Sequence, residues 1–183
     1  HTLQTLRRFE IKRIPVENDV EYLYVEGIYF TWKATGDDAW MKSFLDSALR
    51  AFRYSTVSGL RWSRKLGLLK RGYTIDTWDF QAKEDADRTG FIMKVHPRKT
   101  RFGVMHGDNT GFAASCGFLS EMLDHAGRKR EASRIRALGA RVRKRLDKVS
   151  WNGRFFTHHV PEQKGLKRDL GVDEKKQLSL SNA

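Results

Sequence analysis

The same order of segments occurs twice in this chain: an apolar helix, a short turn with glycine, an amphipathic helix and a long connecting stretch. Residues 18–35 and 37–57 form the first predicted helix pair, and residues 109–126 and 130–149 form the second. An apolar helix must be covered by its neighbours, whereas an amphipathic helix can face solvent on one side. The pattern therefore predicts a mostly α-helical fold built from hairpins with inner and outer helices.

The first of these helices has apolar residues on most of its circumference. Asn18 or Asp19 can cap its amino end, and Gly36 follows its last residue. We expect other helices to enclose it, and Asp37 or Asp38 to cap the next helix. In the first helix, the residues at helical spacing on one main face are Val20, Leu23, Tyr24, Gly27, Ile28 and Thr31. Tyr22, Val25 and Phe30 make other faces of this helix apolar as well.

Length and composition suit one globular domain. The chain has 183 residues, of which 39% are hydrophobic and only three are prolines. It has no apolar run long enough to cross a membrane, so we predict a soluble protein; the compartment stays open, with the cytoplasm favoured. The chain starts without methionine, and we therefore expect it to be a trimmed or excised piece of a longer protein.

The charge is strongly basic, with 35 Lys and Arg against 22 Asp and Glu, a net of +13. A nucleic-acid-binding helical module is one interpretation, because the run Arg128–Lys148 could neutralise several phosphates. The same residues fall on the solvent side of a predicted outer helix, where charge is expected in any case. A helical scaffold for protein contacts is a further alternative.

The densest group of candidate site residues lies in the stretch Gly72–Gln81, within the long link between the two helix pairs. A carboxyl group pressed against an indole loses solvation, so its acid form survives to higher pH, as a general acid for glycosidic cleavage requires. The alternative is that the aromatics belong to the core and that one aspartate belongs to a turn. The candidates for a carbohydrate site here are Asp76, Trp78, Asp79, Phe80 and Gln81.

Two further places offer substrate contacts. His106, Asp108 and Asn109 precede or begin the third helix, where they could contact a sugar or form a metal corner, although a helix cap explains the last two without a ligand. Trp62 could stack on the apolar face of a pyranose, and an interior anchor is the competing interpretation.

The sequence predicts no metal and no cofactor. The single cysteine, Cys116, lies among apolar residues and is expected to be a buried structural thiol. His158 and His159 lie in a strand-like stretch, where adjacent side chains point to opposite faces and cannot easily chelate one ion.

With these residues in view, the chain resembles the six-hairpin glycosidases, the α/α toroid enzymes of the trehalase, processing α-glucosidase and glycogen-debranching types. Residues 21–38, EYLYVEGIYFTWKATGDD, are similar to an inner helix and its turn of that superfamily. Residues 125–156 are similar to a helix pair that ends in a Trp-Asn-Gly turn. The resemblance implies an incomplete barrel, with the remaining hairpins or a second copy as partners.

The sharpest match to this superfamily is Trp78-Asp79-Phe80. Trehalase-like members have a Glu-Ser-Gly-Trp-Asp-Phe motif whose aspartate is the general acid, which corresponds to Asp79. Here Ile75-Asp76-Thr77 precedes the tryptophan, so Asp76 takes the sugar-binding place of the missing glutamate or is itself the acid. The resemblance implies inverting hydrolysis, with a second carboxylate roughly 6.5 to 9.5 Å away.

In that superfamily the catalytic base is a late glutamate, which would lie beyond Ala183. The active site lies at the amino ends of the inner helices. This chain has polar residues at both places, namely Glu17, Asn18, Asp19 and Glu21 at the first inner helix and His106, Asp108 and Asn109 at the second.

Overall fold

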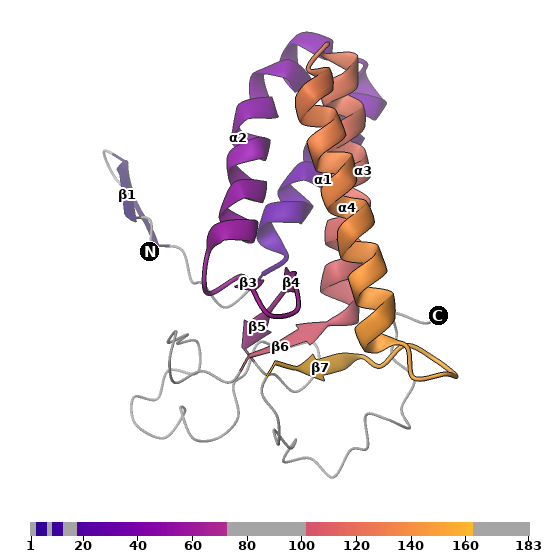
Figure 1. The fold of residues 1–183 in the computed structure, drawn as a ribbon. Helices are drawn as coiled ribbons and strands as arrows, with labels where there is room; N and C mark the ends of the chain where they lie inside the picture. The colour runs from indigo at the N-terminus through magenta and orange to yellow at the C-terminus, as the bar shows by residue number, and fades with distance from the viewer. Residues whose placement is uncertain (1–2, 7–8, 13–17, 73–101, 163–183) are drawn as a thin grey trace.

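Four helices run side by side in the computed structural model, and most of the short strands lie at one end of them (Figure 1). The prediction of a mostly α-helical fold is confirmed. The structure describes residues 3–6, 9–12, 18–72 and 102–162. The helices are α1 (Val20–Thr35), α2 (Asp38–Val57), α3 (His106–His125) and α4 (Lys129–Ser150). None of the helices in these ranges is long and apolar enough to cross a membrane.

The two helical hairpins turn at glycines, as the sequence predicts. Gly36 has φ +68°, and its N–H donates to the carbonyl of Trp32 at 2.8 Å. Gly127 ends the second hairpin turn with φ +77°. Both angles are in the left-handed region, which residues with a Cβ rarely adopt. Of the two candidates for the cap of α2, Asp37 accepts a hydrogen bond from the backbone N–H of Trp40 at 2.9 Å.

The link between the hairpins is more structured than its sequence indicates. It contains β3 (Trp62–Ser63), β4 (Leu68–Leu69) and β5 (Arg71–Gly72), and β6 (Phe102–Met105) leads directly into α3. β3 pairs with β4, and β6 lies between β5 and β7 (His159–Pro161) in an antiparallel sheet. The predicted lead-in near the amino terminus contains a hairpin of β1 (Leu3–Leu6) and β2 (Phe9–Lys12).

The burial of α1 differs from the sequence prediction. Only one side of this helix is covered, because α2 and α3 pack against it from that side. The buried side holds Tyr22, Val25, Ile28 and Trp32. The opposite side is exposed at Val20 (44%), Leu23 (47%), Tyr24 (38%) and Phe30 (56%). The expectation that other helices enclose α1 is therefore wrong, and of the residues at its main predicted spacing only Ile28 is buried.

The core lies between α3 and its neighbours. Phe112, Leu119, Met122 and Leu123 of α3 are fully buried, and burial raises the pKa of the Cys116 thiol to about 12, as suits a structural cysteine. In α4, the apolar stripe packs on α3 and the basic residues are exposed, as predicted. The exposed basic residues of α4 are Lys129, Arg130, Arg134, Arg136, Arg141, Arg143, Lys144, Arg145 and Lys148.

The closest approach of α3 and α4 depends on Gly139. A Cβ at this position would lie 2.7 Å from the Cβ of Cys116 and 3.2 Å from the carbonyl oxygen of Ala113. The carbonyl oxygen of Ala113 belongs to the backbone of α3, so it cannot move unless the helix moves. The missing side chain therefore sets the distance between the two helices.

We expect Gly139→Ala to destabilise the protein by about 1–3 kcal/mol, because overpacking outweighs the better helix propensity of alanine. Gly117→Ala is the matched control, since a Cβ at Gly117 on α3 meets no atom within 4 Å. That variant should gain about 0.5–1 kcal/mol from propensity alone. Urea denaturation of both variants measures the difference, and a Gly139→Ala protein as stable as the Gly117→Ala protein would contradict the prediction.

Candidate functional site

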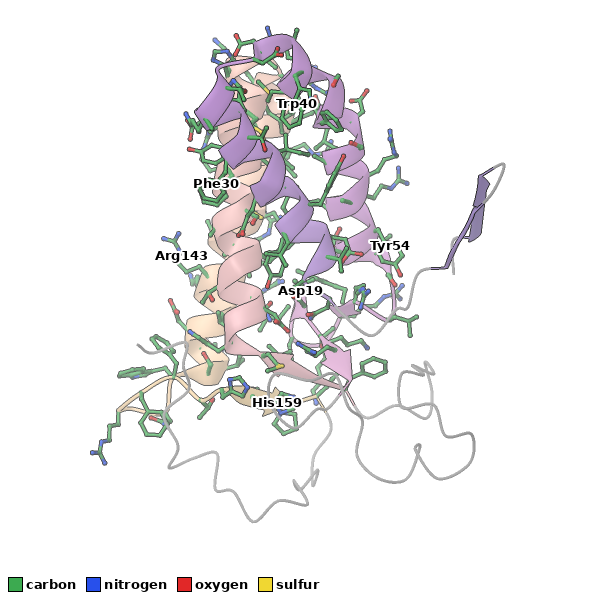
Figure 2. The ribbon with its side chains drawn as sticks, turned by 180° about the vertical axis from the view of Figure 1, so that it is seen from behind. Asp19, Phe30, Trp40, Tyr54, Arg143 and His159 are labelled. Carbon is green, nitrogen blue, oxygen red and sulfur yellow. The ribbon has the colours of Figure 1, made fainter. Side chains whose placement is uncertain are left out.

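The amino ends of α1 and α3 lie side by side next to the strands, and buried polar residues gather there. Asn18 is fully buried, and Glu21, Asp108 and Asn109 are exposed by 3%, 9% and 0%. Figure 2 places Asp19 at this end of α1, close to the strands. Helix amino ends carry unpaired N–H groups and a partial positive charge, so carboxylates are favoured there. This group of residues is the candidate site.

Asn109 attaches the first turn of α3 to β4. Its Nδ2 donates to the carbonyls of Leu69 at 3.0 Å and Met105 at 2.9 Å, and its Oδ1 accepts from the N–H of Leu69 at 2.8 Å. The helix starts at His106 and its cap is Met105 without a side-chain bond, so the cap interpretation of Asp108 and Asn109 is wrong. Asn109 holds the first turn of α3 in place, because its amide makes three hydrogen bonds to backbone groups.

Asp108 forms a buried ion pair with Arg71 of β5. Its Oδ2 lies 3.6 Å from Nη1 of Arg71, and the two side chains are exposed by only 12% and 9%. Burial raises the pKa of the Asp108 carboxyl, because the charged form loses water; Arg71 opposes the shift and Asp19 adds to it. The carboxyl therefore keeps its proton to higher pH than an ordinary aspartate and can donate a hydrogen bond.

Tyr22 contributes a hydroxyl to the same place. Burial raises the pKa of this phenol, with further contributions from the negative charges of Asp108 and Asp19. The hydroxyl is therefore protonated at any physiological pH. The ring lies against Gly111 of α3, where a Cβ would come within 2.7 Å of it. Glycine at this position lets the tyrosine reach the amino end of α3.

A second buried pair joins the first turn of α1 to the stretch after α2. Arg61 has no exposed surface, and its Nε is 3.9 Å from Oε1 of Glu21, whose side chain is exposed by 3%. The guanidinium is 6.0 Å from the ring centre of Tyr54. A buried ion pair costs desolvation that the attraction repays only with good geometry. These two arginines and two carboxylates make the site strongly polar.

His106 lies on a different side of α3 from Asp108. Its Nδ1 is 3.0 Å from the hydroxyl of Ser150, and its ring stacks on Phe156 with centres 4.5 Å apart. Burial lowers the pKa of His106 and favours the neutral ring. Residues two apart on a helix point in nearly opposite directions. The predicted grouping of His106 with Asp108 is therefore wrong, and the histidine joins α3 to the end of α4.

Trp62 packs on the hydrophobic core. Its ring centre lies 6.4 Å from that of Phe112, and β3 holds it opposite Leu69. The interior anchor is thus the interpretation that its contacts favour, although the ring is only partly buried. A contact with a sugar stays a prediction for this residue.

The central motif falls outside the described residues, so the structure gives no position for Asp76, Trp78, Asp79, Phe80 or Gln81. The described residues on either side of this motif are Gly72 and Phe102, which pair across β5 and β6. Arg71, which contacts Asp108, is one residue before Gly72. The chain therefore enters the motif from a strand that forms part of the candidate site.

Sequence reasoning missed Arg61, Arg71 and Tyr22 as site residues. The two arginines lie in residues 60–72, a segment with as many basic as apolar side chains. Composition therefore does not distinguish them from Arg64 and Lys65, which are exposed. Tyr22 was assigned to an apolar helix face, and its spacing gave no sign that the hydroxyl would meet a carboxyl from another helix.

Comparison of the chain with protein-family models, curated proteins and solved structures gives no match. Among the residues that the structure describes, no three His, Cys, Asp or Glu side chains are grouped as metal ligands. The candidate site is therefore defined by its own geometry: two helix amino ends, two buried ion pairs, a phenol and a carboxyl with a raised pKa.

We expect the pKa of Asp108 to be visible in the pH dependence of stability. The folded protein holds this proton to higher pH than the unfolded chain, whose aspartate has the ordinary value near 3.8. The free energy of unfolding should therefore fall as pH rises from about 4 through the raised pKa. An asparagine at position 108 cannot ionise, so the free energy of unfolding of Asp108→Asn should not show this decrease. Urea denaturation in steps from about pH 4 upward tests it, and parallel curves for the two proteins would contradict it.

Proposed function

We propose that this chain is part of a glycoside hydrolase-like protein and that it binds carbohydrate at the paired amino ends of α1 and α3. The observation that carries the proposal is the mostly buried Asp108, whose pKa burial raises, paired with Arg71. Arg71 is one residue before the strand end that leads toward the acidic and aromatic motif. Hydroxyl-rich ligands need closely spaced donors and acceptors, and this group supplies both. The resemblance to six-hairpin glycosidases implies an active site at the same helix ends.

The buried residues of the site include both hydrogen-bond donors and hydrogen-bond acceptors. Arg71 and the Tyr22 hydroxyl are hydrogen-bond donors, whereas Asn18 and Glu21 provide oxygen acceptors. The neutral form of Asp108 donates one hydrogen bond and accepts others, so it can join two sugar hydroxyls. The amino ends of both helices favour partial negative charge on a bound oxygen.

The proposed reaction is inverting hydrolysis of a glycosidic bond in an oligosaccharide or glycoside. The resemblance assigns the general acid to Asp79, which would give its proton to the departing oxygen. A second carboxylate would take a proton from water as the water attacks the anomeric carbon from the opposite face. Asp108 and Arg71 would hold the sugar ring rather than transfer the proton.

Sugar binding tests the described part of the proposal. The chain is titrated with a panel of α-linked gluco-oligosaccharides, and binding is followed by saturation-transfer NMR and calorimetry. We expect Asp108→Ala to weaken binding by about tenfold or more, because buried groups lose their partner. Asp108→Asn should retain most of the affinity, since an amide keeps both a donor and an acceptor at the position of the neutral acid.

Asp124→Ala is the matched control, because Asp124 is an exposed aspartate near the other end of α3, paired with Arg136. Its sugar affinity should equal that of the wild type. Circular dichroism confirms that each variant is folded. An affinity that is the same in Asp108→Ala and in the control would remove Asp108 from the site.

The assignment of the acid has its own test in a form of the protein that hydrolyses glycosides. Asp79→Asn should reduce turnover of ordinary glycosides about a hundredfold or more, with binding nearly unchanged. Substrates with an acidic phenol as leaving group need little protonation and should be affected much less. Equal loss on both substrate types, or no loss at all, would place the acid elsewhere, with Asp76 the next candidate.

A further inference from the structure

A groove of about 1080 Å³ lies between α2 and α4. Figure 1 shows these two helices standing apart, with α1 and α3 behind them. The groove is bounded by the carboxyl-terminal half of α2, residues 49–57, and the amino-terminal half of α4, residues 131–141. It shares no residue with the candidate site at the amino ends of α1 and α3.

The groove has an apolar floor. Leu49 and Phe52 come from α2, and Ile135 and Leu138 come from α4. At one end of the groove Val57 is exposed by 60% and extends the apolar surface of the floor. An exposed apolar strip of this kind is a common mark of an interaction surface.

The rim of the groove is basic. Arg53 from α2 and Arg134 and Arg141 from α4 are exposed along it. The acidic residue among the lining side chains is Glu131, and Arg128 binds it with Nη2 at 2.7 Å from Oε1. The rim therefore presents positive charge to anything that enters.

The spacing of the lining residues fits a helix as the occupant. On α2 the lining positions are 49, 52, 53, 56 and 57, and on α4 they include 131, 134, 135, 138 and 141. Each wall thus contributes side chains three or four residues apart, which form ridges that a third helix can match. The backbone groups of both walls are already bonded within their helices, so an extended peptide would find no strand edge to pair with.

We propose that this groove binds an amphipathic helix of a partner protein, with an apolar stripe that contacts the floor and acidic residues on both flanks that face the arginines. A second copy of this chain is a poor occupant, because it carries the same net charge of +13. A nucleic acid would leave the apolar floor without contacts, since its phosphates would reach only the rim. The inference does not rest on the proposed carbohydrate function.

The test uses the whole chain and a synthetic fluorescein-labelled peptide of about five helical turns. The peptide has leucines at helical spacing and glutamates on either side of them. Two comparison peptides have lysines in place of the glutamates, or the same composition in shuffled order. Fluorescence polarisation should show saturable binding of the acidic amphipathic peptide, with at least about tenfold weaker binding of both comparison peptides.

Two pairs of variants locate the binding. Arg134→Glu with Arg141→Glu reverses the rim charge, and Arg143→Glu with Lys148→Glu makes the same charge change on α4 outside the groove lining. Figure 2 shows Arg143 on the side of the molecule away from α2. Val57→Ser removes an apolar contact in the groove, and Val20→Ser does so at an exposed position of α1.

The rim variant should weaken binding of the acidic peptide about tenfold or more, and Val57→Ser should weaken it several-fold. Both controls should stay within about twofold of the wild type. Equal losses in the rim variant and its control, or equal binding of the shuffled peptide, would mean simple charge attraction and overturn the proposal. Competition by double-stranded DNA for the same arginines, or self-association lost in the rim variant alone, would overturn it in favour of another occupant.

Discussion

The attachment of α3 to β4 through the buried amide of Asn109 determines the rest of the site. Three hydrogen bonds tie this side chain to Leu69 and Met105, so the first turn of the helix and the strands cannot move independently. Asp108 is the preceding residue, and β5 follows β4 after one residue. The amide therefore fixes the distance between Asp108 and Arg71, on which the ion pair and the arrangement of hydrogen-bond donors depend.

The buried charges next to this attachment reduce the stability of the fold through the loss of their hydration. Isolated carboxylates and guanidinium groups lose their hydration when they are enclosed, and replacing such pairs with well-packed apolar side chains is often neutral or stabilising. The pairs Glu21 with Arg61 and Asp108 with Arg71 therefore do not account for the stability of the bundle, which comes from the apolar core along α3. Their concentration at one end of the helices is the reason that we place ligand binding there.

The sequence predicts the helices well and the side-chain partners poorly. Glycine turns and apolar spacing are local signals, so all four helices lie within a few residues of their predicted limits, and Asp37 caps α2. Tertiary packing decides which side of α1 is exposed, and it also decides that His106 and Asp108 have different partners. Local sequence patterns do not contain this information. Part of the predicted site, residues 76–81, lies outside the described residues, whereas the buried arginines of the site emerge only from the folded structure.

The pairing of Gly72 with Phe102 also bears on how a protein of this kind can diversify. The two ends of the intervening sequence are held opposite each other by a strand pair that belongs to the sheet below the helices. Closing a longer loop costs only slightly more entropy than closing a shorter one. Insertions and deletions between these anchors would leave the helical scaffold and its buried charges in register. The length of the chain between residues 72 and 102 can thus change without a change in the helices and strands that the structure describes.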